Sequence, residues 1–427
     1  MKHQFAFARL ALLALLLSVT ACTPPPATPT ATPAAVVPSD TSAPPDLPPL
    51  TVPPTPELTG PAIQRLAVNS AFDVTFIRMV SQEDGWAIGG ANKASDHVFL
   101  TWDGGLTWRD VTPPEPAPAA DAPVAALGFF KDAATAWVVY GPAFAGTIPP
   151  FLFVWRTSDG GATWQYGTVD TSIASEAFSP WYLVFSDSQN GWLMVYLGAG
   201  MMHNYVALFA THDGGATWTD ILDPFTDGGI QSFSKTDFVF VDAQTGWLTR
   251  DSNGVDPIPH VFRTTDGGVT WTRLDLPAPP QASNLFADYY CGTYTINRFS
   301  PASVIVAVKC EDIATLETQL NFQYATTDGG ATWQIVRLPE GYTFNASNDG
   351  LFYFDPNYGF ALGRNIYQTT DGGQNWTLIK QVAWDGQFSF YNMNLGWAVA
   401  RSDGAIALVK TTNGGAKWEI INPHVRP

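Results

Sequence analysis

The stretch Thr264-Thr265-Asp266-Gly267-Gly268-Val269-Thr270-Trp271 decides the fold, because the chain contains seven variants of it. Successive copies start 56, 54, 53, 62, 43 and 42 residues apart. The central residues of the copies are six aspartates and one asparagine: Asp103, Asp159, Asp213, Asp266, Asp328, Asp371 and Asn413. A period of roughly 50 residues indicates a repeat architecture.

The octapeptide predicts a tight turn between two strands. An aspartate side chain accepts hydrogen bonds from backbone N–H groups near it, and paired glycines tolerate positive φ. Apolar residues flank the copies, as in Val98-Phe99-Leu100 and Ile335-Val336, which is the pattern of strand, turn, strand. Seven carboxylates spread over seven units cannot converge on one substrate, and Asn413 could not act as an acid. We therefore interpret the repeated aspartates as structural.

A second repeated element precedes each turn. It is an apolar stretch, a polar turn and a pair of residues that is Gly-Trp in most copies: Gly85-Trp86, Ala136-Trp137, Gly191-Trp192, Gly246-Trp247, Gly359-Phe360 and Gly396-Trp397. The fifth repeat has lost the pair and offers only Val304-Ile305-Val306. Each repeat should thus form four short strands, A to D. Seven such units predict an all-β protein, a seven-bladed β-propeller of four-stranded antiparallel blades. Packing between blades would explain why tryptophan recurs at both repeated positions.

The N-terminus predicts export and lipidation. Lys2 and Arg9 accompany an apolar run from Leu10 to Val19, so residues 1–21 are expected to be a signal peptide, too short to span a membrane as a helix. The ending Val19-Thr20-Ala21-Cys22 resembles a bacterial lipobox, in which the cysteine becomes the lipidated N-terminus. Ordinary secretion that leaves Cys22 as a thiol is the alternative. We expect a protein of the cell envelope, lipid-anchored and facing outside the cytoplasm.

Residues 22–60 predict a disordered tether. They hold thirteen prolines and no aromatic residue, Lys or Arg, a composition that cannot bury a core and favours polyproline II. Residues 61–427 then form the propeller domain. The formal net charge of −17 argues against nucleic acid as a partner, so membrane attachment should come from the lipid. We expect a monomer.

Two cysteines remain in the propeller, Cys291 and Cys310. Two strand-like runs between them meet at Ser300-Pro301, and a hairpin folded about that point places the two cysteines opposite each other. In an oxidising compartment they should form a disulfide; two buried free thiols are the alternative.

The octapeptide is similar to the Asp-box, or BNR repeat, of sialidases and sortilin-type receptors. The two-part unit, with Gly85-Trp86-Ala87-Ile88-Gly89 followed by Thr101 to Trp108, resembles still more the photosystem II stability and assembly factor family. This resemblance covers residues 70–420. It implies an extracytoplasmic, seven-bladed propeller that binds proteins during assembly of a membrane complex.

A carbohydrate-binding or glycoside-hydrolase propeller is the alternative function. Sialidases use an Arg triad and an Arg-Ile-Pro motif, and Phe76-Ile77-Arg78-Met79 is the nearest stretch but lacks the proline. Arg156 and Arg263 each precede an Asp-box threonine, which is a recurring structural position. We therefore expect no catalytic residue. Met201-Met202-His203 could suit a soft metal, but no second His or Cys lies at ligand spacing, so neither a metal nor a cofactor is expected.

Topology predicts which face binds a partner. In an up-and-down blade the A–B and C–D turns share one face, and the B–C and D–A connections share the other. The B–C segments are long in blades two to five, at about 140–151, 195–205, 250–260 and 307–321. Loops on a rigid scaffold often bind ligands, and exposed aromatic or Met side chains suit a protein partner or a sugar. The candidate binding residues are Tyr140, Phe151, Trp181, Tyr196, Met201, Tyr205 and Phe225.

Overall fold

The computed structural model describes residues 60–118, 122–142, 148–174, 177–200, 203–222, 230, 234–252, 256–315, 319–342 and 350–427. The expected signal peptide, Cys22 and the tether up to residue 59 lie outside these ranges, as do Met201 and Phe225. Within the described ranges, no helix is long and apolar enough to cross a membrane.

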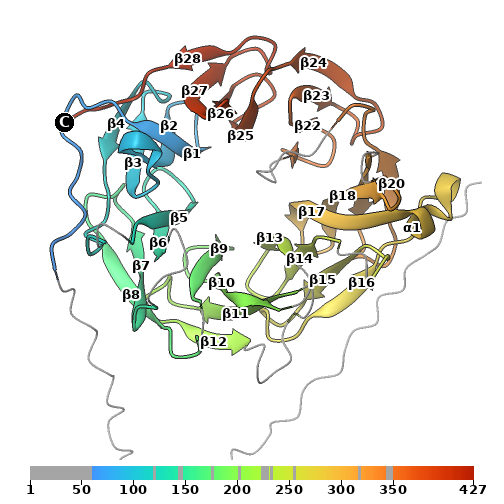
Figure 1. Ribbon diagram of the computed structural model, residues 1–427, viewed down its shortest axis with the longest axis horizontal. Helices are drawn as coiled ribbons and strands as arrows, with labels where there is room; N and C mark the ends of the chain where they lie inside the picture. The colour runs from blue at the N-terminus through green and yellow to red at the C-terminus, as the bar shows by residue number, and fades with distance from the viewer. Residues whose placement is uncertain are drawn as a thin grey trace, which may run out of the picture. The chain divides into compact units, whose positions relative to one another are not determined.

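Seven antiparallel sheets, each of four consecutive strands, stand side by side in a ring (Figure 1). This confirms the predicted seven-bladed propeller. Blades 1 to 3 consist of β1 Asp73–Met79, β2 Asp84–Gly90, β3 His97–Trp102, β4 Thr107–Asp110; β5 Val124–Phe130, β6 Ala136–Pro142, β7 Phe151–Thr157, β8 Gln165–Asp170; and β9 Ser179–Phe185, β10 Gly191–Gly200, β11 His203–Thr211, β12 Thr219–Leu222.

Blades 4 to 7 consist of β13 Lys235–Phe240, β14 Gly246–Arg250, β15 His260–Thr264, β16 Thr272–Asp275; β17 Tyr289–Ser300, β18 Ser303–Asp312, β19 Gln319–Thr326, β20 Gln334–Arg337; β21 Leu351–Tyr353, β22 Gly359–Ala361, β23 Asn365–Thr369, β24 Thr377–Gln381; and β25 Asp385–Phe390, β26 Gly396–Ser402, β27 Ala405–Thr411, β28 Glu419–Ile421. Three short helical turns, η1 Ala91–Lys93, η2 Pro280–Ala282 and α1 Leu285–Asp288, lie in connections between strands. The first strand of each blade is the innermost (Figure 1).

The Asp turns are held by their own side chains. In blade 4, the carboxylate of Asp266 accepts hydrogen bonds from the Thr264 hydroxyl at 2.8 Å and from the Thr270 N–H and hydroxyl at 2.9 and 2.5 Å. Burial alone would raise the pKa of Asp266, but the hydrogen bonds from Thr270 and Thr264 outweigh burial, so the pKa is lowered. Gly268 has φ 100°, which is why glycine is needed there. The repeated carboxylates are therefore engaged within their own turns.

The Asp turn also bonds the A–B turn of the same blade. In all seven blades the N–H of the first glycine donates to a carbonyl of that turn, as from Gly267 to Gln244 O at 2.9 Å. The two kinds of turn thus share one face of the ring, which we call the turn face. The opposite face, which carries the B–C and D–A connections, is called the loop face.

Three of the Gly-Trp tryptophans bond the Asp turn of the next blade. Trp192 of blade 3 is fully buried, stacks on Phe240 of blade 4 with ring centroids 3.5 Å apart, and donates its indole N–H to Gly267 O at 2.7 Å. Trp137 bonds Gly214 O of blade 3 in the same way, and Trp397 bonds Gly104 O of blade 1. The two repeated motifs therefore interlock across the blade boundaries.

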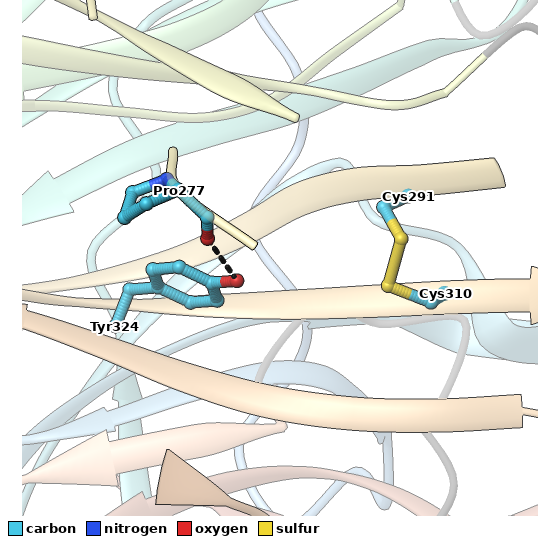
Figure 2. Close-up of a disulfide and its surroundings, with 4 residues drawn as sticks. All are labelled: Pro277, Cys291, Cys310 and Tyr324. Atoms are coloured by element: carbon cyan, nitrogen blue, oxygen red, sulfur yellow. Dashed lines mark hydrogen bonds between the residues drawn. A yellow bond between two sulfur atoms is a disulfide. The ribbon is translucent and has the colours of Figure 1, made fainter. Parts of the chain in front are cut away.

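Blade 5, which lacks the Gly-Trp pair, uses two other devices. The amide of Gln323, on β19, donates to Gly372 O of blade 6 at 2.5 Å, the equivalent of the glycine carbonyl that a tryptophan bonds elsewhere. Cys291 on β17 and Cys310 on β18 are paired in register and form a disulfide with Cα atoms 4.0 Å apart (Figure 2). Closing this loop is worth about 3 kcal/mol by the chain-entropy estimate.

The hairpin that carries the disulfide differs in detail from the expectation. Its turn is centred on Pro301 and Ala302, one residue later than predicted, because Ser300 pairs with Ser303. Two register shifts in β17 take up the difference and still place Cys291 opposite Cys310. On the neighbouring strand, the Tyr324 hydroxyl donates to Pro277 O at 2.9 Å and fixes the connection from blade 4 (Figure 2).

The ring closes at the boundary between blades 7 and 1. Gln387 and Ser389 of β25 bond the backbone of Ile77 and Met79 on β1 at 2.8 and 2.9 Å. The C-terminal strand β29, His424–Val425, adds in parallel to β4 as a fifth strand of blade 1. The guanidinium carbon of Arg426 lies 3.6 Å from the ring centroid of Trp102. We call residues 422–427 the C-terminal latch.

Candidate functional site

The long connections of blades 3 and 5 are largely strand. β10 and β11 extend to Gly200 and from His203, so the predicted loop at 195–205 is a lengthened hairpin in which Tyr196 pairs with Val206 and Tyr205 with Gly198. The segment 307–321 is likewise mostly β18 and β19. Alternating apolar residues pair across these segments, so the ladder continues where a loop was expected.

Tyr140 is wrongly placed among the exposed binding residues. It lies on β6 with only 2% of its surface exposed and packs in the core cluster between blades 1 and 2. Phe151, Trp181, Tyr196 and Tyr205 are half-buried. Trp181 and Tyr196 pack edge-to-face with ring centroids 5.6 Å apart. The aromatic residues of this half therefore pack mainly on the scaffold.

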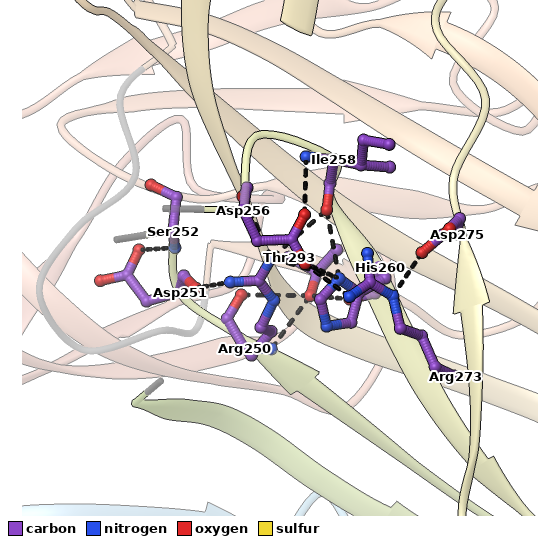
Figure 3. Close-up of polar contacts among 9 residues, drawn as sticks. All are labelled: Arg250, Asp251, Ser252, Asp256, Ile258, His260, Arg273, Asp275 and Thr293. Carbon is purple, nitrogen blue, oxygen red and sulfur yellow. Dashed lines mark hydrogen bonds and ion pairs between the residues drawn. The ribbon is translucent and has the colours of Figure 1, made fainter. Parts of the chain in front are cut away.

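The described part of the blade 4 loop is held by a polar network around Arg250 (Figure 3). The Arg250 side chain is fully buried and donates to Asp251 O at 3.0 Å and, through Nη2, to Asp256 O and Ile258 O at 3.4 and 3.3 Å. Nη2 lies 3.8 Å from the Asp256 carboxylate, which also pairs with Arg273 at 2.5 Å. Desolvation lowers the pKa of Arg250 to about 10, so it stays charged at neutral pH. The network fixes the described part of this loop.

A cavity of about 630 Å³ lies on the loop face where blades 6, 7 and 1 meet. Its cations are Lys93, Arg364 and Arg401, and its acids are Asp385 and Asp403. The lining also includes the hydroxyl residues Thr75, Ser95 and Ser402. The short B–C turns of blades 6 and 7 leave this region open.

Two turns that contain residues with positive φ form the rim of the cavity. Asn92 and Lys93 in η1 have φ 54° and 64°, and Asp403 in the β26–β27 turn has φ 49°. These are three of the four non-glycine residues with positive φ in the described chain. For Asp403, which precedes Gly404 in a two-residue hairpin turn, positive φ is ordinary, whereas for Lys93 it costs roughly 1–3 kcal/mol. Lys93 is fixed there by its N–H, which donates to Asp73 at 2.9 Å.

A second cavity of about 280 Å³ adjoins the first, between blades 1 and 2. The two cavities share Thr75, Ser95 and Arg401 as a common wall. The second is largely apolar, and its larger apolar side chains are Phe76, Ile88 and Leu127. We call the two together the loop-face groove, with a basic half and an apolar half.

The shared wall contains a β-bulge. The register of β1 with β2 shifts between Val74 and Phe76, so Thr75 is the extra residue. The Thr75 hydroxyl bonds Ser95 at 2.8 Å, and its carbonyl accepts from Arg401 Nη2 at 2.6 Å. Bulges often re-aim side chains beside functional sites, and this one brings the Arg401 guanidinium to the junction of the two halves.

The charges in the basic half are partly compensated. Arg364 donates to both oxygens of Asp385, at 3.1 and 2.8 Å, and this pairing lowers the pKa of Asp385. Lys93 Nζ donates to the Gly404 carbonyl at 2.5 Å. Lys93 Nζ and Arg401 Nη2 each donate to a backbone carbonyl at the edge of the cavity, and Asp403 is a further acid in its lining.

The carboxyls whose pKa is raised lie away from the groove. Among the described residues these are Glu115, whose pKa burial raises to about 7, and Asp237, which burial raises to about 6. Glu115 accepts from the Trp155 indole at 2.5 Å, and Asp237 accepts from the Ile296 N–H at 2.7 Å. Neither lines the groove. Among the described residues, no group of three or more His, Cys, Asp or Glu side chains is placed to hold a metal ion.

Replacing Glu115 with glutamine is expected to stabilise the protein above neutral pH. Between the unfolded pKa of 4.5 and the folded pKa of about 7, the folded state keeps a proton that the unfolded state loses. The contribution of Glu115 to the free energy of unfolding is therefore fully present below pH 4.5 and is lost as the pH rises to 7. The loss between these two pH values is up to about 3 kcal/mol. The glutamine oxygen can still accept from Trp155.

Denaturant unfolding at pH 4 and pH 8 checks this expectation, with the exposed Glu340→Gln as the control. The Glu115→Gln protein should gain stability over the wild type only at pH 8. An equal effect at both values would mean that Glu115 is not a buried acid.

Comparisons with known proteins find similarity to solved structures, but no match to a protein family or a curated protein. Similar solved structures include YCF48 bound to a D1 peptide (14% identity, 83% of this chain, 100% of that chain, TM-score 0.47) and YCF48 from Cyanidioschyzon merolae (14%, 82% and 98%, TM-score 0.47). Another is an ulvan lyase from a family of polysaccharide lyases (10%, 82% and 96%, TM-score 0.46). At these values, the likeness carries no assignment of function.

Sequence reasoning placed the candidate site in the long-loop half, whereas the groove lies at the compact blades. Lys93, Arg364 and Arg401 are scattered through the sequence and meet only because the ring closes. The Asp403-Gly404 pair is typical of a tight hairpin turn, but nothing in the sequence marks it as the rim of a cavity.

Proposed function

We propose that the protein is a lipid-anchored, extracytoplasmic propeller that binds a protein partner, as a module in the assembly of a membrane complex. The observation that carries the proposal is the loop-face groove, which joins a basic half to an apolar half on a rigid scaffold. Such a combination suits a binding site, in which a few placed polar groups give specificity and apolar walls give affinity.

The acids of the groove support binding over hydrolysis. A glycosidase uses two carboxyls, one of which is held protonated by a raised pKa. Asp385 has a lowered pKa instead, and the described carboxyls with raised pKa, Glu115 and Asp237, do not line the groove. The repeat's resemblance to the assembly factor family supports the same function.

The envelope location is supported by two features. The Cys291–Cys310 disulfide is the kind of bond that persists in oxidising compartments. The Val19-Thr20-Ala21-Cys22 stretch supports lipidation.

The full-length protein should crosslink to a membrane-associated protein in intact cells. Photo-crosslinking from residues at the rim of the groove, followed by mass spectrometry of the adduct, tests this. The same label on the turn face, at the exposed Leu106, is the control. Hydrolysis of a member of a glycoside panel, abolished by Asp403→Asn, would contradict the proposal in favour of an enzyme.

The mature N-terminus is expected to be an acylated Cys22. Mass spectrometry of the N-terminal peptide should show cleavage before Cys22 and lipid on it, and Cys22→Ala should release the protein from membranes. A free thiol at position 22, or a Cys22→Ala protein that stays membrane-bound, would contradict lipidation.

A further inference from the structure

Residues 61–67 precede the first blade and lie against the connection that follows β4; we call them the N-terminal strap. We propose that the strap is a proton-controlled closure, docked while His97 and Glu115 hold their protons and released when both lose them. Release would add the strap to the expected tether before it, which lengthens that tether by about 20 Å of extended chain. The reach of the propeller would then depend on pH, a property beyond the proposed binding function.

The strap is held to the blade by few contacts. The Ile63 N–H donates to Glu115 O at 2.8 Å, and the Ala117 N–H donates to Pro61 O at 2.7 Å, so one short antiparallel bridge forms. All strap residues are described, and Ile63 is the only buried one, with 9% of its surface exposed. A segment with one buried side chain and few backbone bonds opens at a low cost in free energy.

His97 holds the strap through a ring that needs two protons. Its Nδ1 lies 2.7 Å from a carboxylate oxygen of Asp96, and its Nε2 lies 3.0 Å from Gln64 O in the strap. Both partners are acceptors, whereas a neutral imidazole has only one N–H to donate. The docked geometry therefore requires the imidazolium, and deprotonation removes one of the two hydrogen bonds.

The surroundings of His97 favour the imidazolium. Burial alone would lower its pKa, but the hydrogen bonds to Asp96 and Gln64 and the charge of Asp110 outweigh burial, so the pKa is raised. The Asp110 carboxylate also accepts from the Leu66 N–H of the strap at 2.9 Å. Because docking raises the pKa of His97 above 6.5, its contribution to docking is full below pH 6.5 and is lost as the pH rises through the raised pKa.

Glu115 adds a second proton to docking. Burial raises its pKa from 4.5 to about 7, although a hydrogen bond from Trp155 Nε1 at 2.5 Å lowers it. Its backbone carbonyl accepts from Ile63, so departure of the strap lets water reach this residue and relieves the burial. The contribution of Glu115 to docking is therefore full below pH 4.5 and is lost as the pH rises to 7. Both residues weaken docking in the same direction, as the pH rises.

The charges around these two residues act in the same direction. The groups that face them are two acids, one cation of the strap and one phenol: Asp96, Asp110, Arg65 and Tyr140. Tyr140 stays neutral, because burial and the nearby acids raise its pKa. With both protons bound, two carboxylates and two cations sum to zero; with both lost, three carboxylates and one cation sum to −2. Repulsion among the acids therefore opposes docking at alkaline pH.

A fixed corner limits how far the strap can open. The Ser70 N–H donates to Ala67 O at 3.0 Å, and Asn69 has φ 67°, so the chain turns sharply after the strap. The C-terminal latch holds the next residues, because the Asn69 N–H donates to Val425 O at 2.7 Å and the Val425 N–H donates to Ser70 O at 2.9 Å. Opening therefore ends at this corner, and blade 1 stays closed.

Hydrogen exchange of the full-length protein at pH 5.5 and pH 8.5 tests the proposal, with rates corrected for the intrinsic effect of pH. We expect the protection of the Ile63 and Leu66 amides to fall by at least about tenfold between these values. The amides of β14, Gly246–Arg250 in blade 4, are the internal reference. Their protection should change by less than about twofold.

Two variants separate the two protons. Glu115→Gln keeps an acceptor for Trp155 and should retain about tenfold more strap protection than the wild type at pH 8.5. His97→Gln loses the cation, so it should lower strap protection at pH 5.5 and leave a smaller pH dependence. The double variant should show no pH dependence beyond that of β14, and the exposed Glu340→Gln should match the wild type. Far-UV circular dichroism shows that each variant is folded, and Glu115→Gln keeps the proposal testable if His97→Gln is not.

Three outcomes would overturn the proposal: equal strap protection at both pH values, equal falls in the strap and β14, or a wild-type pH dependence in the double variant. The exchange measurement needs no partner. Its failure would therefore leave the proposed function standing, and failure to crosslink a partner would leave the strap as proposed.

Discussion

Replacing Trp192 with alanine is expected to lower the free energy of unfolding by about 3–5 kcal/mol. The indole is fully buried at the boundary of blades 3 and 4, stacked on Phe240 and bonded to Gly267 O. Its removal leaves a cavity between two blades and a carbonyl without its donor, so both blades lose support. Denaturant unfolding monitored by far-UV circular dichroism measures the change.

The matched control is Trp192→Phe. Blade 6 has phenylalanine at the equivalent position, where Phe360 stacks on Phe390 with centroids 4.2 Å apart. This variant keeps a stacked ring but loses the N–H donor and part of the ring volume, so its cost should be about 1–3 kcal/mol. If Trp192→Ala costs no more than Trp192→Phe, the tryptophans do not hold the blades together by packing.

Replacing Arg250 with alanine is expected to cost a similar amount, about 3–5 kcal/mol. The guanidinium is wholly buried, donates to three backbone carbonyls and pairs with Asp256 (Figure 3). Without it, these carbonyls are buried with one partner fewer, and the blade 4 loop loses its anchor. Unfolding free energy, together with hydrogen exchange of the Asp256 and Ile258 amides, checks both effects.

Arg273→Ala is the control for this prediction. Arg273 pairs with the same Asp256, but 40% of its side chain is exposed. Exposed pairs contribute about 0–1 kcal/mol, so this variant should be nearly as stable as the wild type. Equal losses in the two variants would place the energy in the ion pair with Asp256 and not in the buried bonds to the carbonyls.

The repeats made the blades predictable because each repeat contains, in consecutive residues, the strands and turns of one blade. Asp266 and its glycines define a turn by local hydrogen bonds alone, and the structure shows those bonds. Hairpin symmetry in the local sequence also placed Cys291 opposite Cys310, although two register shifts in β17 move the turn by one residue. Blade 5 shows the limit, since the part that Gln323 takes in place of a tryptophan depends on contact with the next blade.

The candidate site was far less predictable. Tyr140 was expected on the surface because it ends an apolar run before a long segment, yet the neighbouring blade covers it. Arg401 and Lys93 meet only through closure of the ring, and no periodicity relates their positions. Cavities between blades arise from how sheets pack against each other, which short sequence patterns do not encode.

The C-terminal latch has a consequence for the order of events during synthesis. Blades 1 to 6 can each form as their strands emerge, because every blade uses consecutive strands. The bonds from Gln387 to Ile77 and from β29 to β4 join residues about 310 positions apart, so blade 1 must wait with an open edge until the final residues appear. During that interval β4 is an edge strand whose outer side is not yet covered by β29 and is open to pairing with another chain. Any factor that protects the nascent protein is therefore needed most at blade 1, until residues 422–427 cover β4.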